Sequence, residues 1–148
     1  MYAQDFKALV YDLPNLPTKE LGDAVLHCPD ENKLRNALRK YRFSKIIIVC
    51  PSKKLIGLDT LLLEYPIIQL FVLNNDQDND LTEWDDALIL NNMIKIPTER
   101  QLMRRLCTMI VLCYRIQSTE YREKENQSMA NLCILDALKV LDYAIRFI

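Results

Sequence analysis

Residues 45–50, KIIIVC, form a continuous apolar run that ends at Pro51. The pattern returns at residues 67–73, IIQLFVL, and in shorter form at residues 93–96, MIKI, which Pro97 follows. Runs without alternation indicate strands that are covered on both faces. Helical patterns separate the runs, and strands that alternate with helices predict a parallel sheet in an α/β protein.

The first part of the chain adds to this sheet. Residues 6–11, FKALVY, predict a first strand. Residues 24–28, AVLHC, fit either the end of a short helix capped by Thr18 or a poor strand, and the pattern does not choose between them. Asp30 is expected to cap a clearer amphipathic helix. We therefore predict a doubly wound parallel sheet of four or five strands.

Helices are expected between and after these strands, over about 55–64, 81–90 and 128–147, with a long one after Thr98. The last helix is apolar on two sides, which is typical of a helix with two neighbours. We predict two parts, a sheet domain over 1–97 and a long helical extension over 98–148.

Composition excludes several classes of function. Nineteen basic and twenty acidic residues give a net charge of -1, so nothing in the balance indicates nucleic acid or an anionic membrane as a partner. Two glycines are too few for a glycine-rich phosphate-binding loop. No apolar run is long enough to span a membrane, and the N-terminus lacks the features of a signal peptide.

The chain has five cysteines, no CxxC pair and a single histidine, His27, so no metal site and no cofactor are expected. An odd number of cysteines in apolar contexts is typical of buried free thiols, which predicts a reducing compartment, the cytoplasm. Cys50 could act as a nucleophile, but without a nearby base an inert buried thiol is the favoured interpretation.

Residues 44–106 resemble the later half of a response-regulator receiver domain, which implies a flavodoxin-like fold. The matching pieces are IIIVCPSKKLIGLDTLL, IIQLFVLNN, LTEWDDALIL and MIKIPTERQLMRRL. Receivers bind magnesium through acidic residues after the first strand and accept phosphate on an aspartate at the end of a middle strand. Here Asp12 alone stands at the first place, and Cys50 ends the middle strand, so the resemblance implies a pseudo-receiver without phosphotransfer.

Three residues remain candidates for ligand binding at the carboxyl ends of the strands: Asp12, Asn74 and Lys95. Lys95 stands where the receiver family has a lysine and could bind an anion, although a solvated lysine is the simpler interpretation. Asp12 and Asn74, with Asn75 and Asp76, could form a cation site or simply form turns.

Two further resemblances concern other parts of the chain. Residues 113–141 are similar to one tetratricopeptide hairpin, with Ser118 and Tyr121 in its first helix and Ala130 and Ala137 in its second. A lone repeat cannot bury both of its faces, so the resemblance implies either that further repeats follow or that another copy pairs with it. In the related TIR layout, Glu64 would take the place of the glutamate that NAD-cleaving members use, but the motif that flanks that glutamate is missing here.

These observations favour a non-catalytic protein–protein interaction or signalling scaffold. The expected partner is another protein or a second copy, bound through the exposed apolar side of the last helix, at Leu132, Leu135, Val140 and Phe147. The alternatives are a small-ligand or anion sensor at the carboxyl edge of the sheet and a TIR-like enzyme.

Overall fold

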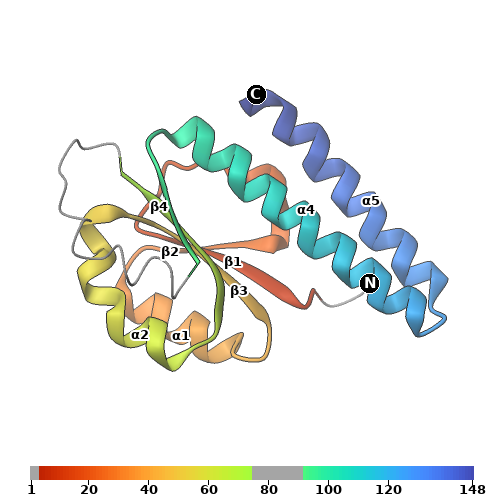
Figure 1. Ribbon diagram of the computed structural model, residues 1–148, viewed down its shortest axis with the longest axis horizontal. Coiled ribbons are helices and arrows are strands. Elements are labelled where there is room, and N and C mark those ends of the chain that lie inside the picture. The colour runs from red at the N-terminus through yellow and green to blue at the C-terminus, as the bar shows by residue number, and fades with distance from the viewer. Residues whose placement is uncertain (1–3, 75–91) are drawn as a thin grey trace.

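The computed structural model describes residues 4–74 and 92–148 (Figure 1). Five strands form one all-parallel sheet in the order β2-β1-β3-β4-β5. This order is that of flavodoxin-like proteins. The α/β class and the parallel sheet are thus confirmed. The strands are β1 (Phe6–Tyr11), β2 (Val25–Cys28), β3 (Lys45–Pro51), β4 (Ile67–Leu73) and β5 (Met93–Ile96).

The central strand β3 shows why the apolar runs lack alternation. Residues 46–50 are completely buried. Successive side chains point to opposite faces of a sheet. Ile47 therefore joins the apolar cluster on one face, whereas Ile46 and Ile48 join the cluster on the other. Both faces of this strand are core, as its sequence predicts.

One face of the sheet is covered by α1 (Glu31–Lys40) and α2 (Asp59–Glu64), and a 3-10 helix, η2 (Ser52–Leu58), leads into α2. Asp30 caps α1 as expected, because its Oδ1 accepts a hydrogen bond from the Lys33 backbone N–H at 2.8 Å.

The opposite face is covered by the long helix α4 (Glu99–Glu123), together with the 3-10 helix η1 (Lys19–Ala24) (Figure 1). Leu102, Leu106 and Ile110 of α4 are fully buried in the same cluster as strand residues. The helix predicted over 81–90 lies outside the described residues. Because that segment connects β4 to β5, the complete doubly wound arrangement stays a prediction, as does a domain boundary at 97/98.

The structure decides the open question at residues 24–28. Val25–Cys28 form β2, a parallel edge strand beside β1. The residues before it form η1, and Gly22 takes a left-handed φ of 59° there. Thr18 does not cap this helix with its side chain. Instead, its Oγ1 lies 2.5 Å from His27 Nε2 of β2.

The last helix, α5 (Gln127–Ala144), is followed by a short 3-10 helix, η4 (Ile145–Phe147). It runs beside α4 in the opposite direction (Figure 1). At one end Ser118 Oγ donates to the Ala130 carbonyl at 3.0 Å, and at the other the Arg100 guanidinium donates to the Ile148 carbonyl. Tyr143 Oη donates to the Pro17 carbonyl at 2.6 Å, which ties α5 to the loop before η1.

None of the helices in the described ranges is both long and apolar enough to cross a membrane.

Candidate functional site

Asp12 occupies the point at the carboxyl edge where the chain from β1 leaves toward β2 and the chain from β3 leaves toward β4. Ligands of open α/β sheets bind at such a switch point. Asp12 has a positive φ of 54°. Its Oδ2 lies 3.9 Å from both Lys53 Nζ and Lys54 Nζ, which follow β3 in η2.

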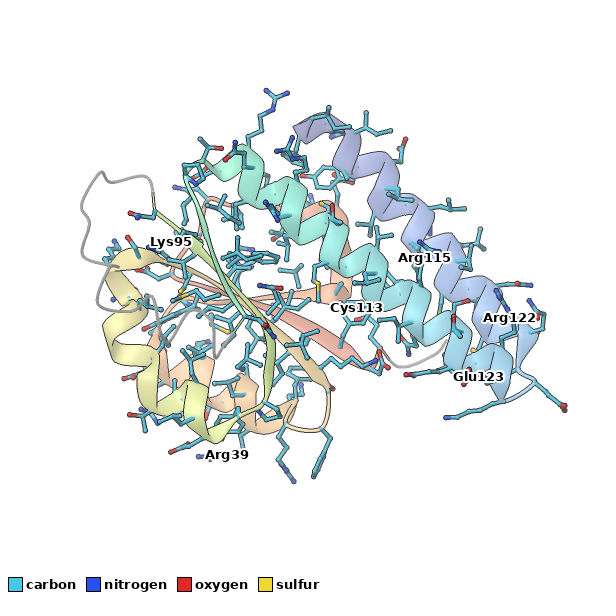
Figure 2. The ribbon with its side chains drawn as sticks, viewed as in Figure 1. Arg39, Lys95, Cys113, Arg115, Arg122 and Glu123 are labelled. Atoms are coloured by element: carbon cyan, nitrogen blue, oxygen red, sulfur yellow. The ribbon has the colours of Figure 1, made fainter. Side chains whose placement is uncertain are left out.

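The three residues predicted for this edge do not form one cluster. Asn74 follows β4, where its backbone N–H donates to the Ile96 carbonyl at 2.9 Å. β3 separates β1 from β4, so Asp12 and Asn74 are two strand spacings apart, about 10 Å. Lys95 lies within β5, beside Val72, and is exposed (Figure 2). Asn75 and Asp76 lie outside the described residues.

Sequence reasoning missed Lys53 and Lys54, the ionic partners of Asp12. The available signal was their position directly after β3, because β1 and β3 are neighbours in a flavodoxin-like strand order. Both pairs are largely open to solvent and long, so they orient the carboxylate more than they stabilise the fold.

A small cavity of about 230 Å³ adjoins Asp12 at the carboxyl ends of β1 and β2. Its walls are mostly apolar, and the other titratable side chains along them are the exposed His27 and the buried Cys28. The cavity is lined by Val10, Asp12, Leu13, Pro14, His27, Cys28 and Pro29.

The thiols at and near this edge are poor nucleophiles. Cys50 is completely buried, and burial raises the pKa of its thiol to about 12. Burial likewise raises the pKa of Cys28 to about 11, an effect to which the charge of Asp30 adds. Reactive cysteines have lowered pKa values and some exposure, so both thiols have the opposite properties.

Neither Glu64 nor a metal-ligating cluster adds catalytic groups to this edge within the described residues. Glu64, the glutamate of the TIR comparison, is exposed at the end of α2, shortly before β4 begins. It therefore lies toward the amino edge of the sheet, away from Asp12. No group of three or more metal-ligating side chains occurs within residues 4–74 and 92–148.

The apolar side predicted for the last helix is partly where it was expected. Leu132 and Leu135 are 40 % and 54 % exposed. Phe147 is half-buried and packs edge-on against Tyr143, with ring centroids 5.2 Å apart. Val140, however, is only 4 % exposed and belongs to the core cluster, because its side of α5 turns toward η1. Val140 is thus not available on the surface of the described structure.

Three other residues are exposed in its place: Leu138 at 54 %, Leu141 at 46 % and Ile145 at 64 %. By sequence these three residues fall on one face of the helix with Ala130 and Ala137, but they do not share the burial of those two alanines. α5 contacts α4 through small side chains, which allow close approach but cover only a narrow side of the helix. We call Leu138, Leu141 and Ile145 the α5 strip.

No protein-family model matches the chain, and no curated protein or solved structure matches it significantly.

Proposed function

We propose that this protein is a non-catalytic protein-interaction module. Its receiver-like, doubly wound sheet would be a phosphorylation-independent scaffold, and the hairpin of α4 and α5 would carry the binding surface. The observation that carries the proposal is the α5 strip, three large aliphatic side chains about half exposed along α5 and the first residue of η4. Scattered apolar residues are ordinary on protein surfaces, but a contiguous row of them is typical of an interaction site.

The chemistry of the carboxyl edge supports this assignment. A receiver accepts phosphate on a carboxylate at the end of its middle strand, and β3 ends here in Val49, Cys50 and Pro51, all buried. The carboxylate of Asp12 is engaged with Lys53 and Lys54. A scaffold that has lost phosphotransfer but has kept its fold accounts for both features.

The test is capture of a binding partner from a lysate of the source cells, with light scattering on the purified chain to detect self-association. The double variant Leu138→Glu/Leu141→Glu places charges on the α5 strip without opening a cavity, because both side chains are exposed. Leu63→Glu is the matched control, since Leu63 is 85 % exposed on α2, on the opposite face of the sheet.

We expect an association that Leu63→Glu retains and that the double variant loses. An association that survives in the double variant contradicts the proposal. So does a chain that stays monomeric and captures no protein.

A second candidate is a small-ligand or anion sensor at the carboxyl edge. It is favoured by the left-handed φ of Asp12 and by its two lysines at the switch point. A thermal-shift screen with phosphate, nucleotides and Mg²⁺ tests it. A stabilisation that Lys53→Ala/Lys54→Ala abolishes, and that Lys33→Ala leaves intact, supports sensing. A screen without any shift contradicts it.

A further inference from the structure

We infer that the partner of this surface is an acidic amphipathic helix that lies along α4 and α5. This inference rests on the proposed function and adds the chemistry of the partner. It is drawn from a row of arginines on α4 that borders the α5 strip.

Arg104, Arg115 and Arg122 are all exposed and lie in one row on α4. Spacings of 11 and 18 residues return to nearly the same direction on an α-helix, within about 20°. Figure 2 shows Arg115 and Arg122 on this helix, well away from Lys95 and Arg39.

The arginine row lies on the outer side of the contact between the two helices. Ser118, whose hydroxyl donates to the Ala130 carbonyl of α5, lies about 40–60° from the three arginines by helical spacing. Leu106, which faces the sheet, lies on the far side of Ser118. Around the circumference of α4, the side that faces the sheet is therefore followed by the side that contacts α5 and then by the arginine row.

The α5 strip lies on the same outer side. Ala137 is buried on the side of α5 that faces α4, and Tyr143 is turned the other way, toward Pro17 and η1. Around the axis of α5, Leu141 lies about 40° and Leu138 about 100° from Ala137, on the side away from Tyr143. The α5 strip and the arginine row thus lie on the same outer side of the helix pair. The pairing of Ser118 with Ala130 and of Arg100 with Ile148 places the strip beside Arg104, with Arg115 just past Leu138 and Arg122 about 18 Å past it.

The arginines of this row are not engaged by the two nearby carboxylates whose ion pairs are seen. Within residues 4–74 and 92–148, Glu120 lies 3.5 Å from Lys45 Nζ, and Asp5 lies 3.4 Å from the same atom. None of the ion pairs in those ranges involves Arg104, Arg115 or Arg122. Guanidinium groups beside an apolar strip suit a ligand with carboxylates beside apolar side chains.

The dimensions fit a helix. From Arg104 to Arg122 the row covers 18 residues of α4, or about 27 Å at 1.5 Å per residue. A partner helix of about five turns would match this length. The α5 strip covers about 10 Å, so two turns of the partner would place apolar residues at positions i, i+3, i+4 and i+7 on the strip, and Glu or Asp would follow the arginine row.

Two other occupants fit less well. A second copy would offer its own exposed α5 side, where Lys139, Asp142 and Arg146 sum to a positive charge that does not complement the arginines. An anionic membrane is typically entered by aromatic as well as aliphatic residues, and the strip is only aliphatic.

The experiment uses three fluorescein-labelled helical peptides of about 20 residues, with binding to the full chain followed by anisotropy. The first has a Leu/Ile stripe flanked by Glu, the second has Lys in place of Glu, and the third has Ser in place of Leu and Ile. The protein variants are Arg115→Glu/Arg122→Glu and the matched control Arg39→Glu, an exposed arginine of α1 (Figure 2).

We expect the acidic amphipathic peptide to bind and the other two peptides to bind at least about tenfold more weakly. The Arg115→Glu/Arg122→Glu variant should lose about tenfold in affinity for the acidic peptide and gain affinity for the basic one. Arg39→Glu should bind the acidic peptide as the unchanged protein does.

Equal binding of acidic and basic peptides overturns the inference. So does a dimer in light scattering that Leu138→Glu/Leu141→Glu dissolves, or binding to phosphatidylserine vesicles without binding to the acidic peptide. A partner that is captured through the α5 strip but is insensitive to Arg115→Glu/Arg122→Glu overturns this inference and leaves the proposed function standing.

Discussion

Gly22 adopts a backbone conformation that other residues rarely adopt, with φ at 59° and ψ at -137°. A Cβ at this position would have no heavy atom within 4 Å, so the cost of a side chain comes from the backbone alone. Gly22→Ala should therefore lower the free energy of unfolding by about 1–3 kcal/mol, measured by urea denaturation.

The other glycine is the matched control. Gly57 also has open space around its Cβ position, but its φ is not in the left-handed region. Gly57→Ala should leave the free energy of unfolding unchanged or raise it by up to about 1 kcal/mol. Equal effects of the two substitutions would show that Gly22 is not under this constraint.

The buried thiols predict a loss of stability in alkali. Burial raises the pKa of Cys50 from 9.0 to about 12, and those of Cys107 and Cys113 to about 11. Between these pH values the folded protein keeps the thiols protonated, whereas the unfolded chain ionises them. The free energy of unfolding is therefore highest below pH 9 and falls as the pH rises toward about 11–12. Each such thiol should account for about 1.4 kcal/mol between pH 8 and pH 10.

The measurement is urea denaturation under reducing conditions at both pH values, for the unchanged chain and for Cys50→Ala. The variant will be less stable at pH 8 because it leaves a cavity, but it should lose less stability on going to pH 10. An identical pH dependence in the two proteins would contradict the account.

At the scale of elements, continuous apolar runs located β3, β4 and β5 to within one residue, because strands buried on both faces leave a simple pattern. β2 was ambiguous because it is an edge strand with Leu26 and His27 exposed. The buried side of α5 could not be derived from periodicity. Helical spacing shows which residues share a side, but the position of α4 and η1 decides which side is covered.

The N-terminus of α4 is capped by the side chain of Thr98. Thr98 Oγ1 accepts a hydrogen bond from the Gln101 backbone N–H at 3.2 Å. Thr98→Ala leaves that N–H without its cap and should lower the free energy of unfolding by about 1 kcal/mol. The matched control is Thr119→Ala, because Thr119 is exposed within α4 and its hydroxyl donates to the Arg115 carbonyl, one turn earlier.

Thermal and urea denaturation of both variants measure this difference. Thr119→Ala should change stability by less than about 0.5 kcal/mol, because alanine favours the helix interior. If Thr98→Ala is as stable as Thr119→Ala, the cap contributes nothing to α4.

At the scale of the whole molecule, both candidate surfaces depend on elements that are distant in sequence. The pairs of Asp12 with Lys53 and Lys54 follow from β1 lying next to β3. The arginine row is visible in the sequence as spacing, but its position beside the α5 strip requires α5 to lie along α4. Local patterns therefore supply the residues of each surface, and the tertiary arrangement brings them together.

We propose that this protein acts through the outer surface of α4 and α5. Hydroxyl-radical footprinting of the chain, alone and with its captured partner, is the decisive measurement, because oxidation reports the exposure of individual side chains. Oxidation of Leu138, Leu141 and Ile145 should fall in the complex while that of Leu63 stays constant. Unchanged oxidation of the α5 strip, with protection confined to the region around Asp12, Lys53 and Lys54, would show that the partner binds elsewhere.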